Sequence, residues 1–215
     1  MHLLLDFDGV IIRSHRIHRM IGKKCQAFTM KHTRRDVNKE LYDSTGHTLL
    51  GLQKIVQPNI SLKEFNRVIY HDIDYVAYLD NIQQEQKDHI HTVRELLKHT
   101  KDNKIPTYLF SNAPDYYCDA VSKQMKVPFI PYIPQHHLKP EPQAYKTIEI
   151  ALQEADKFVF VDDKLINLVN TPQNDKWIRV WYSPETTQHP EKISDDFYIV
   201  PDLLDVVRMD GLLGK

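Results

Sequence analysis

Five short apolar runs restrict the fold of this chain more than any other feature of its sequence. Amphipathic stretches at residues 116–126 and 143–155 separate some of these runs and are long enough for crossover helices. Strands that alternate with helices predict an α/β fold whose core is a parallel sheet. The runs lie at residues 2–7, 106–110, 128–133, 157–161 and 177–181.

The long interval between the first two runs, residues 12–104, has helical patterns and almost no strand pattern. Apolar residues recur there at helical spacing behind Ser61, a candidate N-cap, and residues 83–98 predict a helix that leads back to the sheet. The recurring residues are Phe65, Val68, Ile69, Ile73, Val76 and Ala77. We therefore expect a core formed by residues 1–13 and 93–215, with a helical cap at residues 14–92 inserted between the first and second strands.

Composition argues against several classes of protein. The 215 residues carry a net charge of −1, with 41% hydrophobic and 27% charged residues, which is ordinary for a globular domain. Nothing in this balance indicates a nucleic-acid-binding protein, although residues 13–35 hold eight Lys or Arg and no Asp or Glu. No apolar stretch approaches the roughly 20 residues of a membrane span. Cys25 and Cys118 lack metal-binding or redox spacing, so we expect reduced thiols in a cytoplasmic protein.

Two aspartates stand at the end of the first apolar run, in MHLLLDFDGV. Asp6 and Asp8 are two residues apart, so in an extended segment their carboxyl groups point to the same side. In open α/β sheets, ligands bind at the carboxyl ends of the strands. Gly9 then lets the chain turn away closely. The pair is a candidate site, although short acidic triplets also occur in ordinary turns.

Polar residues also follow the second run and precede a later helix. Ser111 and Asn112 come before Pro114, so a hydroxyl, an amide and helix-start N–H groups suit a bound anion. Lys139 lies in HLKPEPQAY, just before the amphipathic stretch at residues 143–155. Taken separately, a helix cap and a solvated lysine explain these residues better than a shared site does.

Adjacent carboxylates end the most apolar run, in KFVFVDDKLIN. Asp162 and Asp163 directly after a buried strand are unfavourable unless a cation neutralises them. Carboxylate oxygens suit Mg²⁺, which takes one or two carboxylates together with phosphate oxygens and water. Four polar clusters that each follow an apolar run or precede a helix favour one shared site over four separate coincidences.

The segments DFDGV, YLFSN, LKPEP and VFVDD, in this order, resemble the four motifs of the haloacid dehalogenase-like (HAD) phosphohydrolase superfamily. The resemblance covers the expected core and implies a Rossmann-like parallel sheet with an inserted cap. It also implies that Asp6 is a nucleophile and Asp8 a general acid/base, while Lys139 neutralises charge on the nucleophile and on a bound phosphate.

The same resemblance implies a phosphate site and a metal site. Ser111, helped by Asn112, would hold the transferring phosphoryl group. Magnesium is the implied cofactor. Its implied ligands are a carboxylate oxygen of Asp6, the backbone carbonyl of Asp8, the carboxylate of Asp163, and Asp162 either directly or through water.

The stretches LYDSTGHTLLGL and SLKEFNRVIYHDIDY resemble the helical cap of the pyrimidine 5′-nucleotidase-like branch. This finer resemblance implies that the small phosphorylated substrate is a nucleoside monophosphate. Tyr42 and Thr48 are candidates for lining a base pocket, whereas Phe65 is expected to belong to the core. Arg13 and Arg16 are candidates for attracting an anionic substrate, although a solvated basic face explains them as well.

Several alternatives remain open at the level of sequence. Gly9 and Val10 stand where the nucleotidase branch usually has Asn-Thr, and Arg13 stands where many relatives carry an acidic residue. A broad-range or sugar phosphatase, a phosphomutase and a polynucleotide phosphatase are therefore rival functions. A non-enzymatic scaffold is disfavoured because every motif residue is present. A dehalogenase is disfavoured by Asp8, a second acid that those enzymes generally lack.

Overall fold

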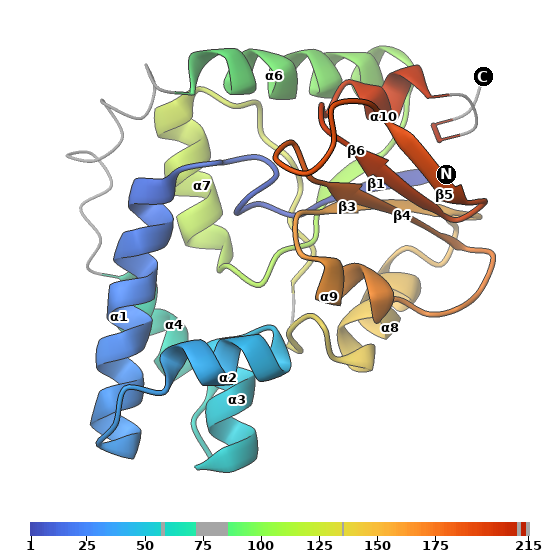
Figure 1. The fold of residues 1–215 in the computed structure, drawn as a ribbon. Helices are drawn as coiled ribbons and strands as arrows, with labels where there is room; N and C mark the ends of the chain where they lie inside the picture. The colour runs from blue at the N-terminus through green and yellow to red at the C-terminus, as the bar shows by residue number, and fades with distance from the viewer. Residues whose placement is uncertain (57–58, 72–85, 135, 210–211, 214–215) are drawn as a thin grey trace.

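The computed structural model of the chain describes residues 1–56, 59–71, 86–134, 136–209 and 212–213. Within these residues six strands form one sheet, in the order β2-β1-β3-β4-β6-β5 (Figure 1). Neighbouring strands are parallel except for the antiparallel pair β5 and β6, which confirms the predicted α/β fold. The strands are β1 (His2–Leu5), β2 (Thr107–Leu109), β3 (Phe158–Asp162), β4 (Trp177–Tyr182), β5 (Glu191–Ser194) and β6 (Phe197–Val200).

The prediction of a strand at residues 128–133 is wrong. The segment makes only an isolated parallel bridge, between Tyr132 and Leu109 of β2. Pro128 and Pro131 have no N–H group, so they cannot donate to a strand ladder. The segment lies along the outer side of β2 and makes two backbone hydrogen bonds with it, from Leu109 N to the Pro131 carbonyl and from Ile133 N to the Leu109 carbonyl.

The C-terminal strands β5 and β6 carry little sequence signal. All four residues of β5 are exposed, so no apolar pattern marks it. In β6 only alternate residues are buried, and the strand has just four residues. Its partner β4 was predicted correctly because four of its six residues are buried.

Helices cover both faces of the sheet. Leu3 and Leu5 of β1 pack in one buried cluster with the apolar residues of α6, whereas Leu4 packs in a second cluster with those of α8. Figure 1 shows α6 and α10 on one side of the sheet and α8 and α9 on the other. Successive side chains of a strand point to opposite faces, so a continuous apolar run is what a doubly covered strand requires. These helices are α6 (Lys87–Asp102), α8 (Pro142–Ala151), α9 (Leu165–Val169) and α10 (Asp205–Arg208), and α7 (Asp115–Met125) follows β2.

Of the five helices that the described residues form between β1 and β2, the first four pack mainly on one another, below and to the left of the sheet in Figure 1. They are α1 (His15–Thr33), α2 (Asn38–Thr45), α3 (Thr48–Ile55) and α4 (Leu62–Tyr70). The predicted cap of α4 is confirmed, because the Ser61 hydroxyl accepts a hydrogen bond from Glu64 N at 3.1 Å. Positions 73, 76 and 77 of the predicted pattern lie outside the described residues. The division of the chain at residues 13/14 and 92/93 remains a prediction.

Helix α6 begins at Lys87, within the range 83–98 that the sequence predicts for a returning helix. Among the described residues, none of the helices has both the length and the apolar character that crossing a bilayer requires.

Gly51 of α3 lies where this helix packs closely on α2, and Gly22 of α1 lies where no neighbour is close. A Cβ atom added to Gly51 of α3 would lie 2.6 Å from the Cβ of Leu41 in α2, whereas one added to Gly22 of α1 would meet nothing within 4 Å. We expect Gly51→Ala to lower the free energy of unfolding by about 1–3 kcal/mol through overpacking. Gly22→Ala, the matched control, should raise it by about 0.5–1 kcal/mol because alanine is the better helix former. Urea denaturation measures both, and equal effects of the two substitutions would contradict this account of the packing.

Candidate active site

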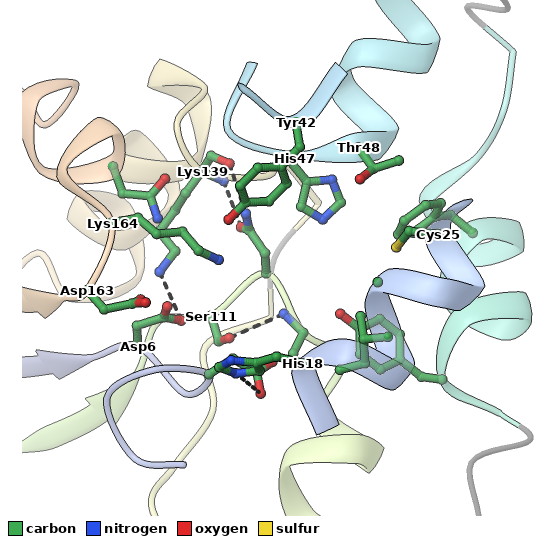
Figure 2. A pocket seen from close by; sticks show the side chains of 18 of the residues that line it. Asp6, His18, Cys25, Tyr42, His47, Thr48, Ser111, Lys139, Asp163 and Lys164 are labelled. Atoms are coloured by element: carbon green, nitrogen blue, oxygen red, sulfur yellow. Dashed lines mark hydrogen bonds and ion pairs between the residues drawn. The ribbon is translucent and has the colours of Figure 1, made fainter. Parts of the chain in front are cut away.

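The carboxyl ends of β1, β2 and β3 lie side by side at one edge of the sheet, and their polar residues face side chains of the helical segment such as Tyr42 and His47 (Figure 2). A cavity of about 390 Å³ lies between them. Most of the residues that the motifs single out line this cavity, and Asp162 lies buried beside it, in contact with Lys139. The lining residues among them are Asp6, Asp8, Ser111, Asn112, Lys139 and Asp163 from the core, and Tyr42 and Thr48 from the helices between β1 and β2.

Arg13 and Arg16 lie outside this cavity. Arg13 lines a smaller hollow, where its guanidinium lies 3.5 Å from the hydroxyl of Tyr182 and 3.7 Å from the carboxylate of Glu185. Arg16 is exposed at the start of α1, because the next residue, Ile17, is the one that this turn of the helix buries. Neither arginine therefore faces the sheet edge.

Lys139 is the centre of the charged cluster. Its ammonium group lies 2.7 Å from the Asp162 carboxylate, 3.1 Å from Asp6 Oδ1 and 2.7 Å from the backbone carbonyl of Phe110. Three donors are thus matched by three acceptors, although the side chain is fully buried. Burial alone lowers the pKa of Lys139, but the charges of Asp162 and Asp6 outweigh it and raise that pKa. Lys139 therefore stays protonated.

Asp162 uses both of its oxygens within the protein. Oδ1 accepts from the backbone N–H of Lys164 at 2.8 Å and from the Asn167 amide at 3.1 Å. Oδ2 accepts from Lys139 at 2.7 Å and from the same amide at 2.9 Å. All of these partners are donors, so the arrangement suits an ionised carboxylate whose main contact is Lys139.

Asp6 and Asp163 leave carboxylate oxygens for a cation. Oxygens of Asp6, Asp162 and Asp163 lie within 4.8 Å of one another. Oδ1 of Asp163 is buried and has no hydrogen-bond partner among the described residues. Burial raises the pKa of Asp163 to about 7, and the charge of Lys164 opposes this only in part. A buried carboxylate that lacks a neutralising partner fits a divalent cation such as Mg²⁺.

Gly9 makes room for Asp163. Its φ of +99° is a conformation that side chains rarely adopt, and a Cβ atom there would lie 2.3 Å from the Asp163 carboxyl group. The turn after β1 therefore needs glycine for two reasons, the backbone conformation and the close approach of the acid from β3.

Asp8 is held from two sides. The hydroxyl of Tyr117, on α7, donates to Asp8 Oδ1 at 2.7 Å, and Nε2 of His18, on α1, lies 3.7 Å from the same oxygen. Burial is the main reason that the pKa of Tyr117 lies well above its ordinary value, and the charge of Asp8 adds to it. Tyr117 therefore remains a hydroxyl donor, and Oδ1 of Asp8 is its acceptor. Oδ2 of Asp8 is the oxygen available to give or take a proton.

Ser111 and Asn112 have different surroundings. The oxygen of the Ser111 hydroxyl accepts from Ala113 N at 3.2 Å, directly before α7. The amide of Asn112 is occupied at both ends by the backbone of Lys139, donating to its carbonyl at 2.8 Å and accepting from its N–H at 2.8 Å. Asn112 therefore fixes the loop that carries Lys139, and Ser111 is the residue of the two with a hydroxyl available.

Several residues of the cavity were not singled out from the sequence. Lys164 follows the motif VFVDD, and its ammonium group lies 5.4 Å from the centre of the Tyr42 ring. Others include His18, Asn38 and His47. Tyr117 does not line the cavity but donates to Asp8, which does. Single histidines and tyrosines inside helical patterns are usually ordinary core or surface residues, so only their proximity to the cavity distinguishes them. For Lys164, adjacency to the acid pair was an available signal.

Comparisons with known proteins agree with this geometry. The profile of the haloacid dehalogenase-like hydrolases matches residues 1–168. The chain therefore belongs to the haloacid dehalogenase-like hydrolase family, as the four motifs predict. A search against curated proteins finds no match.

Solved structures with the same fold come from enzymes with different reactions. A HAD phosphatase from Thermococcus onnurineus is 19% identical, with a TM-score of 0.54, and the match covers 98% of this chain and 97% of that one. A beta-phosphoglucomutase from Clostridium difficile is 17% identical, with a TM-score of 0.54 and coverage of 85% and 84%. An L-2-haloacid dehalogenase from Xanthobacter autotrophicus is 12% identical, with a TM-score of 0.55 and coverage of 98% and 99%. At these identities the likeness concerns the fold.

Removing the central ammonium group should destabilise the protein strongly. Lys139→Met leaves Asp162 and Asp6 buried without their shared cation, which we expect to lower the free energy of unfolding by about 3–5 kcal/mol. Urea denaturation in EDTA-containing buffer measures this, and the exposed Lys146→Met on α8 is the matched control, with an effect within about 0.5 kcal/mol. Adding Asp162→Asn to Lys139→Met should recover part of the loss. A loss below about 1 kcal/mol for Lys139→Met would contradict the central role of the ion pair.

Proposed function

We propose that the chain is a Mg²⁺-dependent phosphatase that hydrolyses phosphate monoesters through an aspartyl-phosphate on Asp6. The supporting observation is the pair of acids after β1. Lys139 and a backbone N–H hold one oxygen of Asp6, and Tyr117 holds one oxygen of Asp8. In each acid one oxygen is held by a hydrogen bond or ion pair. The other is available, in Asp6 for attack on phosphorus and in Asp8 for proton transfer.

Asp6 is oriented for attack by its own surroundings. Its Oδ1 accepts from Phe7 N at 2.8 Å and lies 3.1 Å from the Lys139 ammonium group. The other oxygen, Oδ2, is the nucleophile. In the first step an Oδ2–phosphorus bond forms while the bond between phosphorus and the ester oxygen breaks, and Asp8 gives its proton to the departing oxygen.

The second step returns both acids to their starting states. Asp8 takes a proton from a water molecule as the water oxygen attacks phosphorus. The bond between phosphorus and Asp6 then breaks, and inorganic phosphate leaves. The hydroxyl of Ser111 donates a hydrogen bond to a phosphoryl oxygen, because its own oxygen already accepts from Ala113 N. Asp6, Asp163 and the backbone carbonyl of Asp8 would hold Mg²⁺, which supplies positive charge that offsets the repulsion between carboxylate and phosphate.

The acid at position 8 favours a phosphatase over a dehalogenase. A halide ion departs without a proton, whereas the alkoxide that leaves a phosphate ester is a poor leaving group unless an acid protonates it. Asp163 would also serve no purpose in a dehalogenase. It is suited to bind a cation, and a dehalogenase substrate carries no phosphate whose charge a cation must offset. The hydroxyl of Tyr117 holds one oxygen of Asp8 in place, as a proton donor that must keep one orientation requires.

A nucleoside monophosphate is the substrate class that we propose. The cavity, at about 390 Å³, falls in the size range of small-molecule sites. Tyr42 lines it on the side away from the sheet, where an aromatic ring can stack on a flat base. Phe65 also borders the cavity but belongs to the buried core, as predicted. The likeness of the helical segment to the pyrimidine 5′-nucleotidase-like branch supports the same class. Phosphate release from uridine and cytidine monophosphates, sugar phosphates and a phosphorylated oligonucleotide compares this substrate class with its rivals.

Replacing the nucleophile should abolish turnover and preserve the fold. We expect Asp6→Asn to lower kcat by about four orders of magnitude or more, because no other group can form the covalent intermediate. Phosphate release with Mg²⁺ measures this, and EDTA should remove the activity of the unmodified protein until Mg²⁺ is restored. Asp102→Asn, an exposed residue at the end of α6, is purified in parallel as the control. Undiminished activity of Asp6→Asn would overturn the assignment.

Removing the Tyr117 hydroxyl should affect substrates according to their leaving groups. Tyr117→Phe frees Oδ1 of Asp8, so Asp8 no longer presents its proton to the leaving oxygen in one orientation. We expect kcat for an alkyl phosphate to fall by about tenfold, a small part of the usual contribution of a general acid. For p-nitrophenyl phosphate, whose phenolate departs unprotonated, the change should be within about twofold.

Tyr145→Phe is the matched control for Tyr117→Phe. Tyr145 is also buried, and its hydroxyl donates to the backbone carbonyl of Asn167 at 2.6 Å. Any loss of activity in this variant should be equal for the two substrates, because it comes from packing. An equal loss for both substrates in Tyr117→Phe would show that Tyr117 acts on stability alone.

A further inference from the structure

The side of the cavity away from the sheet is formed by α2 and the first turn of α3. Asn38, Tyr42, His47 and Thr48, here called the roof, line the cavity there. Figure 2 shows the labelled Tyr42, His47 and Thr48 across the cavity from Asp6, Asp163 and Ser111, with Lys164 between the two groups. A substrate whose phosphate sits at Asp6 would therefore direct its organic part toward the roof.

The hydrogen bond that His47 accepts indicates which nitrogen of its ring carries the hydrogen. The residue is the N-cap of α3, and its Nδ1 accepts a hydrogen bond from Leu49 N at 3.2 Å. Burial, with the charge of Lys164, lowers the pKa of His47 to about 3, so the ring is neutral under ordinary conditions. A neutral ring that accepts at Nδ1 carries its hydrogen on Nε2. Nε2–H is thus a donor, and it has no partner among the described residues.

The other polar groups near the roof also offer donors. The Thr48 hydroxyl donates to Asn38 Oδ1 at 2.8 Å, which occupies the amide oxygen of Asn38 and leaves its NH₂ group. Lys164 contributes an ammonium group over the Tyr42 ring. Among the described residues that line the cavity, carboxylates come only from the opposite side, where they are Asp6, Asp8 and Asp163.

The charges of the residues near the roof indicate whether its ligand is a neutral hydrogen-bond acceptor or a second anion. His47 is uncharged, and Lys164 is the one cation near the roof among the described lining residues. Its ammonium group lies over the Tyr42 ring, 5.4 Å from the ring centre. A single cation does not neutralise a second phosphate, whereas the uncommitted N–H groups of His47 and Asn38 match neutral oxygens.

We propose that the roof is a subsite for carbonyl oxygens in the organic part of the substrate, with His47 Nε2–H as the principal donor. The ligand class is a phosphate ester that ends in imide or amide carbonyls, of which a uracil ring is the representative. This proposal rests on the proposed hydrolysis of phosphate esters at Asp6. It adds which chemical groups the helices between β1 and β2 recognise.

The test removes the donor and keeps the helix cap. Asparagine is among the best N-cap residues, so His47→Asn preserves the start of α3, while its shorter side chain withdraws the donor from the cavity. We compare kcat/KM for uridine 5′-monophosphate with that for ribose 5-phosphate, which has the same sugar and phosphate without the base. The unmodified protein should prefer the nucleotide. His47→Asn should lose about tenfold on the nucleotide and change by no more than about twofold on ribose 5-phosphate.

A binding measurement gives a readout that does not depend on turnover. In an Asp6→Asn background, calorimetric titration with uridine 5′-monophosphate should show about tenfold weaker binding when His47→Asn is added. His47→Ala, which loses both the cap and the donor, reports by thermal unfolding how much of any effect comes from stability.

The possible outcomes separate this proposal from the one on which it rests. Equal losses on both substrates, or no loss on the nucleotide, would overturn the carbonyl subsite while leaving the phosphatase in place. A preference of the unmodified protein for a sugar bisphosphate would also overturn it, in favour of a second anion site. Absence of phosphate release from every substrate would overturn the proposed function itself, and with it the subsite.

Discussion

The ammonium group of Lys139 is the interaction on which the rest of the site depends. It joins Asp6, at the end of β1, to Asp162, at the end of β3, and its third partner is the backbone carbonyl of Phe110. Two buried carboxylates from neighbouring strands would otherwise repel each other at short range in a medium of low dielectric constant. Asn112 holds the loop that delivers Lys139, so three strand ends are coupled through one cation.

The cavity divides into two regions of different polarity because of where its walls come from. The sheet edge contributes carboxylates, of which Asp163 has an oxygen without a partner among the described residues. The helices between β1 and β2 contribute neutral donors and aromatic rings, such as His47 and Tyr42. Lys164 lies between the two regions (Figure 2). This division assigns cation and phosphate to the sheet edge, and the organic part of a substrate to the helices.

Strands that are buried on both faces could be predicted from sequence, because both of their faces must be apolar. The runs that became β1 and β3 have this property, and the polar residues after them mark the site. The run at residues 128–133 has the same apolar character but contains Pro128 and Pro131, and the absence of two N–H groups decided against a strand. Strand β5 could not be predicted, because it is exposed along its length and depends on pairing with β6.

The sequence by itself determined the four polar clusters and their order, because each follows an apolar run or precedes a helix within a few residues. Local pattern is enough for such features. Only the tertiary structure decided that Tyr117 reaches Asp8, that His47 and Lys164 face the same cavity, and that Arg13 and Arg16 do not. These placements depend on how helices pack across the sheet edge. That packing brings together residues that are far apart in the chain. A sequence pattern reports regular spacing between nearby residues, so it cannot show such contacts.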